Sequence, residues 1–394
     1  MHVAIVVQPA HGHVNPMLPL VPELLSRGHR VTYATGPECV PAVAATGAKV
    51  LEIPAKVPPM FWPEGATDER VDAMLSAMSG SVRDSLPILL REFTADPPDV
   101  LCYDLTTEAG RILGKILDVP SASLVPHFAF NEALGMRDAI AVADDWTAQD
   151  PGWPWHNYFA AMKETAATYG VEWQDDALEG TSPDGLNLVL IPKEFQYGPE
   201  TFDERFQFLG PLDNSALQAG TWEPADPTKK TLFISFGTLF NNNPQFYKTC
   251  FEAFGDLDWN VALAAHKLDV GELGPIPANF DVRPHFPQLD VLKHASAVVS
   301  HTGIKTLFDA TTLGVPMVIV PPVPMCQLIA TRAEQESLSR VLDPATLDAA
   351  TLRSAVEQIT HDEEILAGVK RYQQIIENCG GAKAGADALE AYAR

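Results

Sequence analysis

Two polar side chains follow apolar, strand-like runs in the first half of the chain. His11 comes directly after the run HVAIVVQPA, in a turn with Gly12, and Asp104 stands near the end of the run DVLCYDL. A histidine whose second ring nitrogen is held by a carboxylate is a usable general base near neutral pH. The carboxylate fixes the tautomer and stabilises the imidazolium that forms. We therefore predict His11 as a base and Asp104 as its partner; the alternative is that both only turn or cap the chain.

A second group of polar residues lies in the segment VVSHTGIKTLFDATTLGVP, over residues 298–316. It places His301, Gly303, Lys305 and Thr306 between an apolar run and a helical pattern. The first turn of a helix offers unpaired N–H groups and the positive end of the helix dipole, which together favour a phosphate. The alternative is that Thr306 caps the helix and Gly303 turns the chain. This segment alone leaves both interpretations open.

The composition restricts the class of protein. A chain of 394 residues suits two domains, and a formal charge of −24 argues against nucleic acid as a partner. No apolar run approaches the length of a membrane span and the start does not resemble a signal peptide, so a cytoplasmic protein without a membrane partner is expected. The five cysteines are scattered without metal spacing, which indicates reduced thiols and no metal site.

Strand and helix patterns alternate along two halves of the chain. In the first half, strands are expected in 2–10, 29–35, 99–105, 120–126 and 186–192, with a helix capped by Asn15 and Pro16. In the second half they are expected in 231–238, 259–265, 280–286, 296–301 and 316–322. The polar stretch between the halves reads as a linker. The prediction is an α/β fold of two doubly wound, parallel-sheet, Rossmann-like domains that face each other across a cleft, with domains at 1–212 and 230–394 and a linker at 213–229.

Ligands of such sheets bind beyond the carboxyl ends of the strands. His11, Asp104, Gly237, Thr238 and His301 all fall at such ends, which favours a functional interpretation of both polar groups.

The order and spacing of several blocks resemble the UDP-dependent macrolide and natural-product glycosyltransferases of actinomycetes. The likeness covers almost the whole chain, through the blocks AHGHVNPMLPLVPELLSRGHRVTYAT, PDVLCYDLTTEAGRIL, LVLIPKEFQ, FISFGT, PQLDVLKHASAVVSHTG and GVPMVIVP. The resemblance implies a GT-B fold, with an N-terminal domain for the acceptor, a C-terminal domain for the nucleotide sugar, and a last helix that packs back on the N-terminal domain. It also implies metal-independent, inverting transfer with the base on His11 and its partner on Asp104. No cofactor is expected beyond the nucleoside diphosphate sugar, which is a co-substrate.

The same resemblance assigns a donor site. It places the diphosphate at His301, Gly303 and Thr306, and the ribose at Asp309, where the family has a glutamate. The chain departs from the family pattern at Thr302 (usually Gly), Lys305 (usually Asn or Gly), His285 (usually the Trp that stacks on uracil) and Met325-Cys326 (usually the acidic residue and Gln that bind the sugar). The charge of Lys305 suits a diphosphate. The full expected set is Gly237, Thr238, His285, Gln288, His301, Thr302, Gly303, Lys305, Thr306, Asp309, Met325 and Cys326.

Loss of the acidic residue at Met325 leaves two interpretations of the donor site. The donor is a deoxysugar nucleotide, on UDP or TDP, with fewer hydroxyls to bind, or the site has decayed. The alternatives to a transferase are accordingly a silent binding protein and a nucleotide-sugar epimerase of the same architecture.

Aromatic residues in the stretches that match the family's acceptor region indicate a bulky apolar acceptor. A macrolide, another polyketide or a phenol suits such a wall, and the expected contacts are Phe61, Trp62, Phe128 and Trp146. The partners expected are thus small molecules; a homodimer is compatible with the sequence, which does not fix the oligomeric state.

Overall fold

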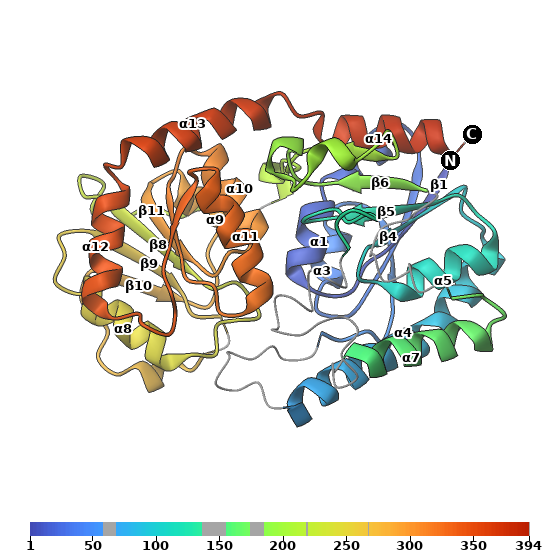
Figure 1. Ribbon diagram of the computed structural model, residues 1–394, viewed down its shortest axis with the longest axis horizontal. Coiled ribbons are helices and arrows are strands. Elements are labelled where there is room, and N and C mark those ends of the chain that lie inside the picture. The colour runs from blue at the N-terminus through green and yellow to red at the C-terminus, as the bar shows by residue number, and fades with distance from the viewer. Residues whose placement is uncertain (58–67, 136–154, 174–184, 218–219, 267, 394) are drawn as a thin grey trace. The chain divides into compact units, whose positions relative to one another are not determined.

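The computed structural model describes residues 1–57, 68–135, 155–173, 185–217, 220–266 and 268–393 (Figure 1). Within these residues the chain forms two compact units. The first runs to Leu217 and takes in the C-terminal segment from Cys379 onward, and the second lies between them and ends at Asn378.

The first unit is built on a seven-stranded sheet in which every neighbouring pair is parallel. The strand order is β3-β2-β1-β4-β5-β6-β7. Apolar runs buried on both faces are typical of such sheets. The strands are β1 (His2–Val6), β2 (Arg30–Thr35), β3 (Lys49–Glu52), β4 (Val100–Asp104), β5 (Ser121–Val125), β6 (Leu186–Val189) and β7 (Phe206–Phe208).

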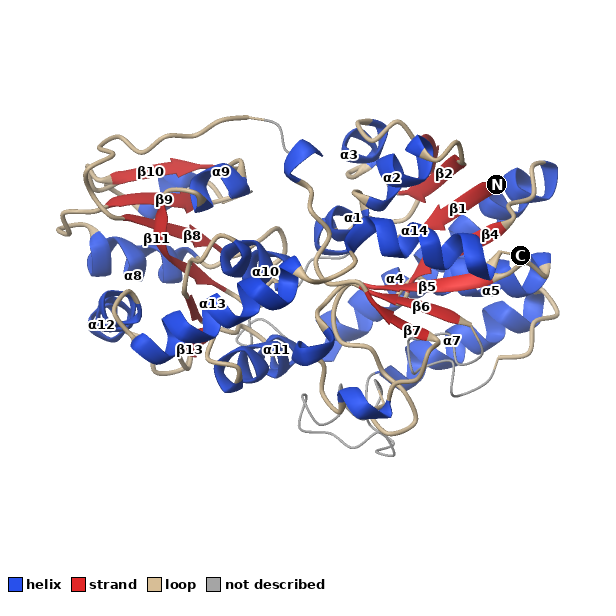
Figure 2. Cartoon of the chain, turned by 90° about the horizontal axis from the view of Figure 1, so that it is seen from above, coloured by secondary structure: helices blue, strands red, loops and turns tan. Residues whose placement is uncertain are grey.

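Helices cover both faces of this sheet (Figures 1 and 2). Successive residues of β1 point to opposite faces, so Val3 and Ile5 belong to one apolar cluster, and Ala4 and Val6 to the other. The first cluster includes side chains of α1 (His11–Met17), α2 (Leu20–Ser26), α3 (Val40–Ala44) and α14 (Gly381–Tyr392). The second includes side chains of α4 (Asp68–Ala95), α5 (Glu108–Leu117) and α7 (Trp155–Thr168).

The second unit has a six-stranded parallel sheet with the order β10-β9-β8-β11-β12-β13. Its strands are β8 (Thr231–Ser235), β9 (Asn260–Ala264), β10 (Phe280–Arg283), β11 (Ala295–Ser300), β12 (Met317–Ile319) and β13 (Ser339–Val341). Its helices are α8 (Pro244–Phe254), α9 (Gln288–Leu292), α10 (Ile304–Thr312), α11 (Pro324–Gln335), α12 (Ala349–Ile359) and α13 (Glu363–Glu377). Short 3₁₀ helices occur in the first unit at Lys193–Phe195, Pro199–Thr201 and Ser215–Leu217, and in the second unit at Val270–Leu273.

The C-terminal helix α14 belongs to the first unit and packs against α2 (Figure 2). Ala386 and Leu389 are fully buried in the cluster that also holds Val3 and Leu24. At the rim, Arg27 Nη1 lies 2.6 Å from Asp387 Oδ1, and His29 Nε2 lies 2.8 Å from Glu390 Oε1. The two ends of the described chain therefore meet in one unit.

The structure corrects the expected start of the first helix. α1 begins at His11, with Ala10 as its N-cap and Pro16 inside it, rather than after Asn15. A second helix begins at Leu20 behind Pro19, so the prolines divide the predicted helix into two. Both histidines of the HGH motif consequently lie on a helix and not in a turn, which decides where each one points.

Candidate active site

In the first unit the strand order reverses between β1 and β4, which are hydrogen-bonded neighbours. The crevice beyond the carboxyl ends of two such strands is where open α/β sheets bind ligands. α1 follows β1 at this point, and Asp104 is the last residue of β4. The sheet thus brings the HGH motif and Asp104 together.

The residue that contacts Asp104 is His13, whose Nδ1 lies 2.8 Å from Asp104 Oδ2. The carboxylate is fully buried, and 21% of the His13 side chain is exposed. Its other oxygen, Oδ1, accepts hydrogen bonds from the amide and the hydroxyl of Thr106. Because the carboxylate accepts the Nδ1 proton, Nε2 of a neutral His13 carries the lone pair and is the basic atom of the pair.

Burial and pairing act on the two pKa values in opposite directions. Burial alone lowers the pKa of His13, but the charge of Asp104 and the hydrogen bond to it outweigh that effect and raise the pKa above its usual value. Burial would raise the pKa of Asp104, whereas His13 and Thr106 lower it below the usual range. The pair is therefore poised to hold a proton on the imidazole while the carboxylate stays charged.

The predicted pairing of His11 with Asp104 is wrong. His11 Nδ1 lies 4.0 Å from the sulfur of Cys39, the N-cap residue of α3, and the carboxylate is bonded to His13. Residues two apart on an α-helix differ by about 200° in direction, so the two imidazoles of HGH leave α1 on opposite sides. The sequence pattern predicted too late a start for this helix. Only the observed start at His11 shows which of the two imidazoles faces β4.

A third imidazole, His127, lies beside His13 and was missed in the sequence. It follows β5, the strand next to β4, and its ring centre lies 6.1 Å from that of His13 with the planes at 89°. The ring of Phe130 also lies next to it, with ring centres 6.2 Å apart at 69°. The signal that could have found it is the one used for Asp104, a polar residue just after a strand-like run, here PSASLVP.

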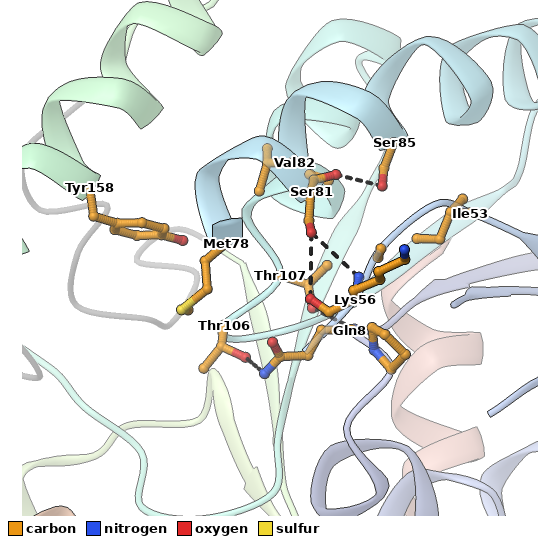
Figure 3. A pocket seen from close by; sticks show the side chains of 13 residues that line it. Gln8, Ile53, Lys56, Met78, Ser81, Val82, Ser85, Thr106, Thr107 and Tyr158 are labelled. Carbon is orange, nitrogen blue, oxygen red and sulfur yellow. Dashed lines mark hydrogen bonds between the residues drawn. The ribbon is translucent and has the colours of Figure 1, made fainter. Parts of the chain in front are cut away.

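Thr106, whose hydroxyl donates to Asp104, also lines a pocket. Figure 3 shows the residues of this pocket. Its cavity volume is about 40 Å³, within about 440 Å³ of empty space that includes open solvent. The Gln8 side-chain amide donates to the Thr106 hydroxyl at 2.6 Å, which connects the pocket wall to the carboxylate. Apolar side chains make up most of the wall, from Pro9, Ile53, Ala55, Met78, Val82, Ala109 and Tyr158, while Lys56, Ser81, Ser85 and Thr107 complete it.

Of the four predicted acceptor contacts, the structure describes only Phe128. Phe61, Trp62 and Trp146 lie outside the described residues. Phe128 is only 2% exposed and stacks on Phe195 with ring centres 5.5 Å apart, so it packs in the interior and does not line an acceptor site. The apolar side chains that do line the pocket are mainly aliphatic and come from the segments after β1 and β3 and from α4, α5 and α7.

In the second unit the strand order reverses between β8 and β11, and the predicted diphosphate residues lie beyond these two strands. Gly237 has a φ of +60°, and a Cβ there would lie 2.8 Å from Cε1 of His301. A side chain at this position would therefore collide with the imidazole. Burial lowers the pKa of His301 to about 4, so the ring is neutral at pH 7 and can donate only one hydrogen bond.

The turn between His301 and α10 leaves polar groups available. Gly303 is the N-cap of α10, and no side chain caps the helix, so the expectation that Thr306 serves as the cap is not met. Thr302 has a φ of +85° and is 2% exposed, and its hydroxyl has no partner. A β-branched residue at positive φ is strained, and a buried hydroxyl without a hydrogen bond adds to the cost. Such a turn suits an anion that would occupy these donors.

Lys305 lies closer to a carboxylate than its predicted diphosphate role suggests. Its Nζ is 2.7 Å and 2.8 Å from the two carboxylate oxygens of Asp309, one turn along α10. Gln288 donates to the same carboxylate at 2.7 Å and accepts a hydrogen bond from Thr306 at 3.2 Å. The structure therefore brings four of the predicted donor residues into one hydrogen-bonded network.

The remaining predicted donor residues are less closely associated. Exposed His285 packs its ring against that of His266, with centres 4.6 Å apart. Thr238 follows Gly237 and is partly exposed. Met325 lies in the first turn of α11, but its side chain is outside the described part of the structure. Cys326 is the residue after Met325 on the same helix and is 9% exposed.

The part of the chain that the structure describes lacks two features, a metal-binding cluster and a membrane-spanning helix. No group of three or more His, Cys, Asp or Glu side chains in that part of the chain has a geometry that could hold a metal ion. No helix there has the length and the apolar character that crossing a membrane requires.

Comparisons with known proteins agree with this geometry. Residues 248–377 match the family described as "Erythromycin biosynthesis protein CIII-like, C-terminal domain". The NDP-glycosyltransferase YjiC of Bacillus subtilis is 34% identical over 401 residues, with 99% of this chain and 97% of the relative covered. The demethyllactenocin mycarosyltransferase of Streptomyces fradiae is 32% identical over 400 residues, with 99% and 86% covered.

A solved structure extends the likeness to three dimensions. The calicheamicin glycosyltransferase CalG4 superimposes with a TM-score of 0.82 at 32% identity, over 99% of this chain and 98% of the other. Two Rossmann-like parallel-sheet units are the architecture of GT-B enzymes. The chain is a glycosyltransferase with the GT-B fold and belongs to the family of macrolide and natural-product glycosyltransferases.

Proposed function

We propose that this glycosyltransferase moves a sugar from a nucleoside diphosphate to a hydroxyl of an apolar natural product, with inversion at the anomeric carbon and without a metal ion. The observation that carries the proposal is the contact of 2.8 Å between His13 Nδ1 and the buried carboxylate of Asp104. It supplies a base whose side chain is partly exposed and whose charged form is stabilised.

In the proposed step, Nε2 of His13 removes the proton of the acceptor hydroxyl. The oxygen attacks the anomeric carbon on the face opposite the diphosphate, and the bond between that carbon and the diphosphate oxygen breaks. The electron pair of this bond leaves with the nucleoside diphosphate, and the proton stays on His13. Asp104 stabilises the imidazolium, since opposite charges in contact at a buried site favour the charged forms.

The donor is proposed to bind at the turn before α10. Uncapped amides at a helix start, together with the neutral His301 and the hydroxyl of Thr302, suit the charge that develops on a leaving diphosphate. UDP and TDP sugars, including deoxysugars, are the candidates. The Met325-Cys326 pair has no carboxylate to bind sugar hydroxyls, which favours a donor that needs few hydroxyl contacts there.

The acceptor is proposed to extend from His13 toward the pocket next to Thr106, which His13 itself does not line. The pocket wall combines aliphatic side chains with hydroxyls and Tyr158, and the hydrogen bonds from Gln8 through Thr106 to Asp104 connect it to the base pair. A hydrophobic polyketide or phenol fits this lining better than a charged metabolite would.

The proposal is tested by comparing His13→Ala with His11→Ala. General-base catalysis contributes roughly 100- to 10,000-fold, so His13→Ala should lose about that factor in kcat/KM for transfer to an aliphatic alcohol. His11→Ala is the matched control from the same helix and should lose far less. Both variants are assayed with UDP- and TDP-sugars by mass spectrometry of the product. Equal losses, or a larger loss for His11→Ala, would show that the base is assigned to the wrong residue.

A further inference from the structure

His127 is held rigidly next to the proposed base. Phe128, the next residue, is buried against Phe195, and the backbone N–H and C=O of Ala129 are both hydrogen-bonded, at 3.0 Å each, to the fully buried side chain of Gln196. The segment after β5 is therefore anchored on its inner side. The imidazole of His127 itself remains partly exposed and contacts the rings of both His13 and Phe130.

The hydrogen bonding of His127 fixes its tautomer. Nδ1 lies 3.2 Å from the backbone carbonyl oxygen of Phe128, and a carbonyl only accepts, so Nδ1 carries the proton. In the neutral ring Nε2 is then an acceptor, and no residue of the described chain bonds to it. His13 has the same arrangement, with Nδ1 donating to Asp104. Two imidazoles side by side thus each offer an Nε2 lone pair.

Burial and the neighbouring charge keep the His127 ring neutral. Burial and the neighbouring His13 lower the pKa of His127 to about 4, although Asp104 and the Phe128 carbonyl oppose them. When His13 takes up a proton during transfer, a second positive charge beside it would be unfavourable. His127 is therefore suited to accept a hydrogen bond and not to act as a second acid.

We propose that His127 is a specificity-determining residue, whose Nε2 accepts a hydrogen bond from a second hydroxyl of the acceptor, adjacent to the hydroxyl that His13 deprotonates. The inference rests on the proposed function and narrows its acceptor class to vicinal diols and catechols. The ring centres are 6.1 Å apart. Two neighbouring hydroxyls, each forming a hydrogen bond of about 2.8 Å, can reach one Nε2 atom each on rings whose centres have this spacing.

The test compares 4-methylcatechol with 4-methylphenol, which lacks the second hydroxyl. For each enzyme variant the ratio of kcat/KM between the two acceptors is measured with UDP-glucose and TDP-glucose. His127→Phe keeps a ring against Phe130 but removes the acceptor nitrogen, so this ratio should fall by about 3- to 10-fold, the value of one hydrogen bond. His127→Gln carries an amide oxygen near the position of Nε2 and should recover much of the ratio. His11→Phe is the matched control and should leave the ratio of kcat/KM between the two acceptors unchanged.

A second measurement does not depend on turnover. In a ¹⁵N spectrum of the histidine side chains, the Nε2 resonance of His127 should move when 4-methylcatechol is added and not when 4-methylphenol is added. An unchanged acceptor ratio in His127→Phe, a His127→Gln ratio as low as that of His127→Phe, or a motionless Nε2 resonance each overturns the inference. Absence of transfer to both acceptors in the unaltered enzyme counts instead against the proposed function, while the titration still decides the role of His127.

Discussion

Replacing Asp104 by Asn separates the electrostatic role of the carboxylate from its shape. The amide has nearly the same volume and can still meet Thr106, but it has no charge to offer His13. In the native pair a fully buried carboxylate bonds the imidazole at 2.8 Å. A hydrogen bond between charged groups contributes about 1.5–3 kcal/mol, and about 1.4 kcal/mol corresponds to a factor of ten. Because the imidazolium forms during transfer, Asp104→Asn should lower the plateau of kcat/KM by about 10- to 100-fold.

The same change should move the acidic limb of the pH profile. His13 must be neutral to accept a proton, and Asp104 raises its pKa, so activity of the native enzyme should fall as the pH drops through a value above the ordinary pKa of histidine. Without the carboxylate, the effect of burial remains and lowers the pKa of His13. The acidic limb of Asp104→Asn should therefore lie at lower pH than that of the native enzyme, although the plateau is lower.

The assay is kcat/KM for one alcohol acceptor between about pH 5 and 9, with saturating sugar nucleotide. Circular dichroism of each variant checks that the fold is retained. An acidic limb that stays in place, or that moves to higher pH, refutes the assignment of His13 as the group that titrates. A plateau that does not fall refutes the electrostatic role of Asp104, whatever the position of the limb.

Two further changes test the donor site and the packing behind the base pair. Lys305→Ala removes the cation that pairs with Asp309 on α10 and should weaken binding of UDP and TDP by about tenfold in calorimetry, less at high salt. Lys293→Ala removes an ion pair with Asp290 and should leave the affinity for UDP and TDP unchanged. Equal affinities in the two variants would contradict a role of the Lys305 network in binding the donor. Gly110→Ala places a Cβ in collision with Cβ of Tyr103 and should lower the free energy of unfolding by about 1–3 kcal/mol in denaturant titrations. Gly12→Ala meets no atom within 4 Å and should be neutral or stabilising; a comparable loss in both glycine variants would show that the close approach of α5 to β4 is not the cause.

Much of the fold follows from the sequence because the strands are short apolar runs with clear ends. The run DVLCYDL predicted β4, and the structure confirms that Asp104 closes it and that α5 begins at Glu108. The strands β3, β7 and β13 were not predicted. KVLE in β3 is exposed or half-buried throughout, and β7 and β13 are only three residues long, so none of them shows the continuous apolar pattern of a buried strand.

The candidate site was predictable in its location but not in its contacts. The sequence places HGH and Asp104 at neighbouring strand ends, yet the choice between His11 and His13 depends on the rotation of α1. Ala10 forms no side-chain cap, so no sequence signal marks that helix start. The partner of Lys305 was missed for a different reason. A lysine four residues before Asp309 can pair with it along the helix as readily as with a ligand, and the sequence does not rank the two.

The return of α14 to the first unit has a consequence for the order in which the chain can fold during synthesis. β1 and β2 leave the ribosome early, but Ala386 and Leu389, which cover part of their apolar face, are made only after the whole second unit. Synthesis adds about 5–20 residues per second, and domains generally fold as they emerge. The second unit can therefore fold as an uninterrupted segment, whereas the nascent first unit must wait with part of its core exposed until the final helix docks.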